Sequence, residues 1–135
     1  MESSLLYQRV FYAGAIWNWA ASIPIFFLVQ SLPGMLHIED PRYPIFIYFN
    51  LMTVMLFGCV QFTVARNIAT TRPFIKILVW SKILTVIVFV GALVLLSTPR
   101  GLVEFIGPGM AVDLVFGLLF WRYLWFSKPT PSTSH

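Results

Sequence analysis

The sequence predicts an all-α integral membrane protein, a four-helix bundle with both termini in the cytoplasm and almost no soluble mass. Hydrophobic residues make up 59% of the 135 residues and charged residues only 10%, well below the roughly 25% that is typical of a soluble domain. The apolar residues gather in four runs, each close to the roughly 20 residues that a helix needs to cross the hydrocarbon core. The loops between these runs are short, and their basic residues are unevenly distributed.

The apolar runs predict four membrane spans, at about residues 10–31, 45–65, 74–97 and 105–126. Residues 1–126 therefore form one domain, and residues 127–135 form a polar tail. Pro24 lies inside the first span, where membrane helices tolerate proline. Three prolines in the loop before the second span exclude a continuous helix there. The start of the last span is blurred by a cluster of polar and helix-breaking residues: Glu104, Gly107, Pro108 and Gly109.

The Lys and Arg residues of the loops predict the orientation. One side of the membrane collects six of them, and the other side collects only Arg42 and Arg100. Because basic loops stay in the cytoplasm, we expect both termini there, in a bacterial inner membrane or another energy-transducing membrane. The scattered basic residues indicate no nucleic-acid groove. The six residues on the cytoplasmic side are Arg9, Arg66, Arg72, Lys76, Arg122 and Lys128.

Polar residues inside the spans are informative because each is costly in hydrocarbon and needs a partner or a cavity. Four of them form a predicted polar seam: Asn18, Gln61, Lys82 and Asp113. Lys82 and Asp113 lie on consecutive spans, so an ion pair between neighbouring helices would relieve the cost of both charges. We favour a pair that fixes helix register over a proton- or ion-coupled site. A Lys82 that reaches the headgroups is a third interpretation.

Small residues accompany the seam at helical spacing. Gly14 precedes Asn18 by one turn, and Gly58 precedes Gln61. Asp113 is flanked by Gly109 and Gly117. Because small residues let helix backbones approach closely, we expect these four glycines to be packing positions. A well-packed bundle core explains them without a ligand.

Several chemistries lack their residues in this sequence. His37 lies in a loop and His135 is the last residue, so no intramembrane histidine is available for haem or copper. Cys59 is the single cysteine; it forms no CxxC pair and fits a small apolar filler. The sequence contains no HExxH, glycine-rich phosphate loop or GxSxG motif. It therefore favours a protein without catalytic residues, metal site or cofactor.

Five short segments carry a family resemblance: residues 15–19 (AIWNW), 56–61 (LFGCVQ), 64–66 (VAR), 80–82 (WSK) and 112–116 (VDLVF). Together they resemble small bacterial four-helix membrane proteins of the DoxX-like family. The resemblance implies a four-helix bundle. Some DoxX-like proteins look like small subunits of membrane oxidoreductases, which suggests an accessory role for this chain, although it carries no redox ligand of its own.

Three functions remain open. We favour a non-catalytic subunit or scaffold of a larger membrane assembly, such as a respiratory or photosynthetic complex, whose partners are the lipid bilayer and other membrane subunits. The second is a small ion-coupled transporter that uses Lys82 and Asp113. The third is a protein that binds a lipid, sterol or quinone. Its cavity would be lined by Asn18, Gln61 and Lys82, with walls from Trp17, Trp80 and Phe116.

Overall fold

A computed structural model describes residues 2–39 and 42–127, without the side chains of residues 2 and 3, so most of the predicted tail lies outside the described residues. The described chain is all-helical, with five helices and no strand. Four of these helices are long and apolar enough to cross a membrane, which confirms the predicted all-α class and its four candidate spans. The helices are α1 (Glu2–Leu28), α2 (Leu32–Leu36), α3 (Ile45–Arg66), α4 (Arg72–Leu95) and α5 (Arg100–Phe126).

The helix ends differ from the predicted spans. The first helix begins at Glu2 and the last at Arg100, both earlier than the apolar runs that predict them, because a helix continues beyond the segment suited to hydrocarbon. The last helix also runs through Pro108, which membrane helices tolerate. The loop after α1 contains the short α2, which has a proline in its first turn. The residue that follows it, His37, is in the left-handed conformation, with φ of 53°.

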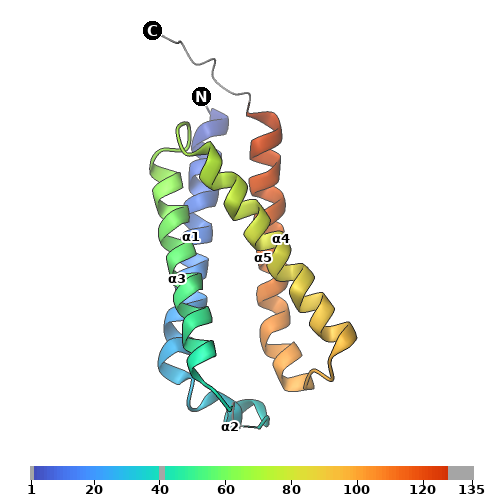
Figure 1. Ribbon diagram of the computed structural model, residues 1–135. Helices are drawn as coiled ribbons and strands as arrows, with labels where there is room; N and C mark the ends of the chain where they lie inside the picture. The colour runs from blue at the N-terminus through green and yellow to red at the C-terminus, as the bar shows by residue number, and fades with distance from the viewer. Residues whose placement is uncertain (1, 40–41, 128–135) are drawn as a thin grey trace.

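The long helices form two close pairs, α1 with α3 and α4 with α5 (Figure 1). The start of α1, the turn between α3 and α4 and the end of α5 lie together at one end of the molecule, the terminal end. The opposite end, the α2 end, carries α2 and the turn between α4 and α5. Helix α4 runs obliquely away from the α1–α3 pair and passes in front of α5, so the two pairs separate toward the α2 end (Figure 1).

The buried apolar core lies in the terminal half of the molecule. At its centre the rings of Phe11 and Phe120 stack with centroids 4.3 Å apart and planes 12° apart. This core joins all four long helices and closes the terminal half with apolar side chains. Its members are Phe11, Val64, Ala65, Ile68, Ile75, Leu78, Val79 and Phe120.

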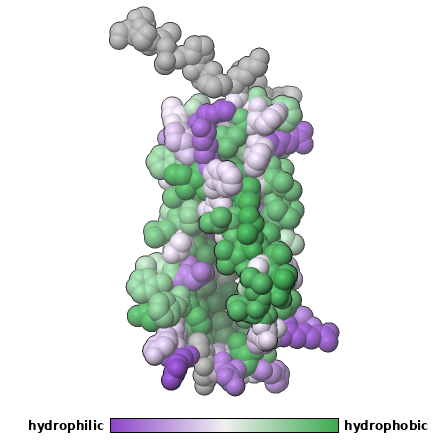
Figure 2. Space-filling model, turned by 45° about the vertical axis from the view of Figure 1, so that its right-hand side comes forward, coloured by the Kyte–Doolittle hydropathy of each residue, from purple (hydrophilic) through white to green (hydrophobic). Residues whose placement is uncertain are grey.

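The outer surface is apolar between two hydrophilic ends (Figure 2). Large hydrophobic side chains on the spans are strongly exposed, among them Phe27, Leu95 and Trp125. Side chains of this kind would be unfavourable in water but match a lipid environment.

Glycines bring the helices of each pair together at defined points. A Cβ added at Gly58 would overlap the indole of Trp19, whose Nε1 donates to the carbonyl of Met55 at 3.1 Å. A Cβ at Gly14 would lie 2.7 Å from Gln61 Oε1, and one at Gly117 would lie 3.2 Å from the Cβ of Lys82. These three glycines occupy close approaches.

Gly109 differs from the other three glycines. A Cβ added there would meet nothing within 4 Å. Gly109 therefore makes no close approach of the kind seen at the other three glycines, because at this point α5 borders a cavity.

Candidate functional site: a polar triad beside a lateral groove

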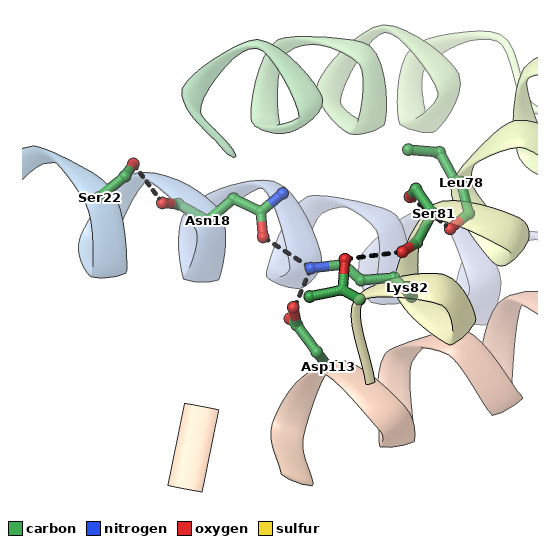
Figure 3. A network of polar contacts seen from close by, with 7 residues as sticks. Asn18, Ser22, Leu78, Ser81, Lys82 and Asp113 are labelled. Atoms are coloured by element: carbon green, nitrogen blue, oxygen red, sulfur yellow. Dashed lines mark hydrogen bonds and ion pairs between the residues drawn. The ribbon is translucent and has the colours of Figure 1, made fainter. Parts of the chain in front are cut away.

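Three side chains from three helices meet in the middle of the molecule. Lys82 Nζ of α4 donates to Asn18 Oδ1 of α1 at 2.9 Å and to Asp113 Oδ1 of α5 at 2.5 Å (Figure 3). The side chains of Lys82 and Asp113 are only 7% and 14% exposed, and Asn18 is buried. We call Asn18, Lys82 and Asp113 the polar triad. It ties α1 to the α4–α5 pair through charge-assisted hydrogen bonds.

The neighbouring hydroxyl groups donate hydrogen bonds to backbone carbonyls of their own helices. Ser22 Oγ donates to the carbonyl of Asn18 at 2.5 Å. Ser81 Oγ donates to the carbonyl of Leu78 at 2.8 Å, and Thr85 Oγ1 donates to the carbonyl of Ser81 at 2.8 Å. Such bonds back to the preceding turn are common for serine and threonine in helices. They leave the triad to bond only within itself (Figure 3).

Besides the third N–H of Lys82 Nζ, two hydrogen-bonding positions of the triad remain open. Asn18 Nδ2 is buried and has no hydrogen-bond partner among the described residues; it points away from Lys82, which holds the amide oxygen (Figure 3). Asp113 bonds Lys82 through Oδ1, and its second oxygen accepts no hydrogen bond from the described part of the chain. An unsatisfied buried polar group costs about 1–3 kcal/mol, and Asn18 Nδ2 shares this state with both amide atoms of Gln61.

A cavity of about 330 Å³ lies against the triad, and we call it the deep chamber. Asn18 and Asp113 contribute its polar wall, whereas most of its other residues are apolar. Gly109 and Pro108 belong to its α5 wall, which explains the open space beside Gly109. The residues that line it are Trp17, Asn18, Ala21, Ser22, Ile25, Leu51, Val54, Phe105, Ile106, Pro108, Gly109, Met110 and Asp113.

A second cavity of about 620 Å³, the mouth chamber, adjoins the first toward the α2 end. The two chambers share four lining residues, Ile25, Leu51, Phe105 and Ile106. Side chains of α2, Pro33 and Leu36 among them, form the far wall of the mouth chamber. The chambers together make a lateral groove between the helix pairs, and Figure 2 shows the apolar surface hollowed toward this end.

The fourth member of the predicted seam, Gln61, lies apart from the triad. It is fully buried, and both of its amide atoms lack a hydrogen-bond partner among the described residues. It sits against Gly14 near the apolar core and lines neither chamber. The sequence predicted that two amides and two charges come together. In the structure the two charges meet the amide of Asn18, and the amide of Gln61 lies elsewhere. Spacing along a helix does not determine which neighbour a residue faces.

The predicted cavity walls are also only partly present. Trp17 and Asn18 line the deep chamber, but Trp80 and Phe116 line neither chamber. Lys82 stands behind Asn18 and Asp113 and lines neither chamber itself. The sequence analysis missed the lining residues Leu51, Phe105 and Ile106. The cluster from Gly107 to Gly109, which blurs the start of the last span, was the available signal for this part of the wall.

Comparison with protein-family models, characterised protein sequences and solved structures finds no match for this chain. The resemblance to the DoxX-like family stays a prediction. Within the described ranges, no three His, Cys, Asp or Glu side chains lie close enough together to hold a metal ion.

Proposed function

We propose that this protein binds one neutral amphiphilic molecule from the membrane, with a hydroxyl head group at the polar triad and an apolar tail in the lateral groove. The single observation that carries the proposal is the unpartnered Nδ2 of Asn18, a buried donor on a residue that lines the deep chamber. The proposal develops the third of the functions predicted from the sequence. Chamber volumes of 330 and 620 Å³ fall in the range of about 300–1,000 Å³ that is typical of ligand sites.

The chemistry of the triad favours a hydroxyl group. An ammonium and a carboxylate bonded to each other add no net charge, so the site offers no excess charge to an ionic ligand. Asn18 Nδ2 is a donor without a partner; it has almost no accessible surface, so it would reach a ligand by a turn of the amide toward the deep chamber. The second oxygen of Asp113 offers an acceptor. A hydroxyl group both donates and accepts, so a lipid alcohol, a sterol or a quinol satisfies both positions at once. An anionic head group would be repelled by the carboxylate.

The apolar tail of the ligand is expected to contribute more to shape complementarity with the lateral groove than to binding free energy. A ligand that arrives from the bilayer leaves one apolar environment for another, so burying its tail yields little free energy. The hydrogen bonds to the head group act in a region of low dielectric constant, where unmade bonds are costly. Selectivity is therefore expected to come from the triad, with the length of the groove limiting the tail.

The other two predicted functions stay predictions. The apolar core around Phe11 and Phe120 closes the terminal half of the molecule, whereas the groove is hollow toward the α2 end. Access from one side supports binding more directly than transport, which needs access from both sides. The exposed apolar side chains fit lipid contact and contact with other subunits equally well, so they support no particular partner assembly.

The test is extraction and mass spectrometry of lipids that stay with the full-length protein after purification in mild detergent. We expect about one hydroxylated amphiphile per chain to stay with the wild type. Asn18→Leu removes the open donor and also the acceptor Oδ1 of Asn18, while Lys82 keeps its bond to Asp113. Losing one such hydrogen bond should weaken binding about 5- to 30-fold, which corresponds to about 1–2 kcal/mol.

Gln61→Leu is the matched control, because it also replaces a buried amide whose Nε2 lacks a partner but touches neither chamber. It should keep the ligand. As a chemical control, farnesol should bind more tightly than its methyl ether, which accepts but cannot donate. Equal retention by the two variants, or a wild type that carries only bulk lipid, would reject the proposal.

A further inference from the structure

A second groove lies at the terminal end, between the start of α4 and the end of α5. It encloses about 290 Å³ and combines two basic side chains with three tryptophans. It shares no residue with the deep or mouth chambers, so it is independent of the proposed amphiphile site. We call it the basic groove; its lining residues are Arg72, Lys76, Val79, Trp80, Trp121, Leu124 and Trp125.

Arg72 is fixed in place by the end of α5. Its Nη2 donates to the carbonyl of Leu124 at 2.8 Å, and its Nη1 donates to Ser127 Oγ at 2.7 Å and to the Ser127 carbonyl. A guanidinium at the C-terminus of a helix satisfies carbonyls that lack an intrahelical partner. The hydrogen bonds hold the cation at the groove wall without neutralising it, because its partners are uncharged.

Lys76 lies one turn further along α4 and is exposed. It makes no hydrogen bond or ion pair with any residue that the structure describes. The indole N–H groups of Trp80, Trp121 and Trp125 likewise donate to no described residue. The groove therefore combines two basic side chains with three tryptophans, and none of its lining residues is acidic.

We propose that the basic groove binds the head group of an anionic phospholipid. The phosphate diester would lie between Arg72 and Lys76, which match it in charge. Trp121 and Trp125 lie in the last two turns of α5 and belong at the headgroup level, where their N–H groups can donate to phosphate or ester oxygens.

The apolar surface beside the groove provides a path for the acyl chains of this lipid. Leu84 lies one turn beyond Trp80 on α4, and Leu118 lies one turn before Trp121 on α5. Both leucines are 58% exposed. They continue the walls of the groove toward the middle of the bilayer, where a soluble anion would have no favourable contact. This continuity favours a lipid over free phosphate as the occupant.

The experiment uses the full chain in detergent with phosphatidylglycerol and phosphatidylcholine of identical acyl chains, and counts bound lipid by native mass spectrometry. We expect the wild type to keep one phosphatidylglycerol in preference to phosphatidylcholine. Lys76→Gln should reduce this preference about fivefold, the effect of one basic residue at an anionic membrane surface. Arg66→Gln is the matched control, because Arg66 is an exposed basic residue that lies outside the groove.

Three outcomes decide the proposal. A loss confined to Lys76→Gln, with phosphatidylglycerol retained in millimolar inorganic phosphate, supports a phospholipid site. Equal losses in both variants would mean that general surface charge attracts the lipid, and they would overturn it. Displacement of the lipid by inorganic phosphate would also overturn it, because the groove would then be a site for the free anion.

Discussion

Lys82 holds a charged group in the middle of four apolar helices, and its two acceptors explain how. A lone charge at the centre of a membrane helix costs about 2.5–3.5 kcal/mol on insertion scales. Asn18 Oδ1 at 2.9 Å and Asp113 Oδ1 at 2.5 Å accept hydrogen bonds from its ammonium group. The pair thus stabilises the folded state mainly because an unpaired buried charge is so costly. Removing one partner should therefore lower the free energy of unfolding more than replacing both partners with apolar residues.

Asp113→Asn keeps the shape of the side chain and leaves the ammonium of Lys82 without its counter-charge. We expect it to destabilise the fold by about 3–5 kcal/mol, the cost of leaving one member of a buried pair uncompensated. The measurement is thermal unfolding of the purified protein in detergent.

The double variant Lys82→Met with Asp113→Leu supplies the comparison. It replaces both charges with apolar groups and should be markedly more stable than Asp113→Asn, because well-packed apolar residues often match or exceed a buried ion pair. A single variant that unfolds at the wild-type temperature would show that Lys82 finds another partner or reaches the headgroups.

At the level of the helices, hydropathy predicted which segments form the four long apolar helices but not where these helices end. The first turns of α1, from Glu2 onward, and the start of α5 at Arg100 carry polar residues that an apolar pattern omits. The short α2 was also missed, because Pro33 and the two later prolines of the same segment indicated a loop. Hydropathy reports suitability for hydrocarbon, and a helix can continue beyond it wherever no breaker intervenes.

The candidate site was predictable as a set of residue types and only partly as an arrangement. The cost of burying Lys82 and Asp113 in hydrocarbon predicted their pairing without knowledge of the fold. The rotation of each helix about its axis, which turns Asn18 toward Lys82 and Gln61 away from it, depends on packing across the whole molecule. The same holds for Arg72. The sequence indicated it only as one of the basic residues that predict membrane orientation, whereas its guanidinium donates to a carbonyl at the end of α5.

Two glycines on α5 offer a test of the groove, because they stand eight residues apart and have opposite surroundings. Gly109 borders the deep chamber, whereas Gly117 faces the Cβ of Lys82. Gly109→Leu should fill the chamber and abolish amphiphile binding with little change in thermal stability. Gly117→Leu should push α5 from α4 and destabilise the fold by about 1–3 kcal/mol.

Thermal unfolding in detergent measures the change in stability, and lipid mass spectrometry measures the loss of the bound amphiphile. A Gly109→Leu variant as unstable as Gly117→Leu would mean that the chamber is closed in solution. A stable Gly109→Leu variant that keeps its ligand would place the amphiphile elsewhere. Either result would count against the lateral groove as the binding site.

The molecule as a whole is asymmetric along its length. The terminal end combines the apolar core, the basic groove and most of the described basic residues, while the α2 end carries the lateral groove. Arg42 and Arg100 are the basic residues that the described chain places at the α2 end. If the terminal end faces the cytoplasm, as the distribution of basic residues predicts, the lateral groove opens in the opposite leaflet from the basic groove.

This orientation makes a prediction that reporter fusions in bacteria can check. Green fluorescent protein attached to the C-terminus should fluoresce, because it folds in the cytoplasm, and alkaline phosphatase at the same place should stay inactive. Alkaline phosphatase fused after Thr98, in the turn between α4 and α5, should be active because that turn lies outside. The reverse pattern of reporter activity would show that the protein has the opposite orientation in the membrane. The anionic lipid of the basic groove would then have to come from the outer leaflet, and the amphiphile would enter from the cytoplasmic one.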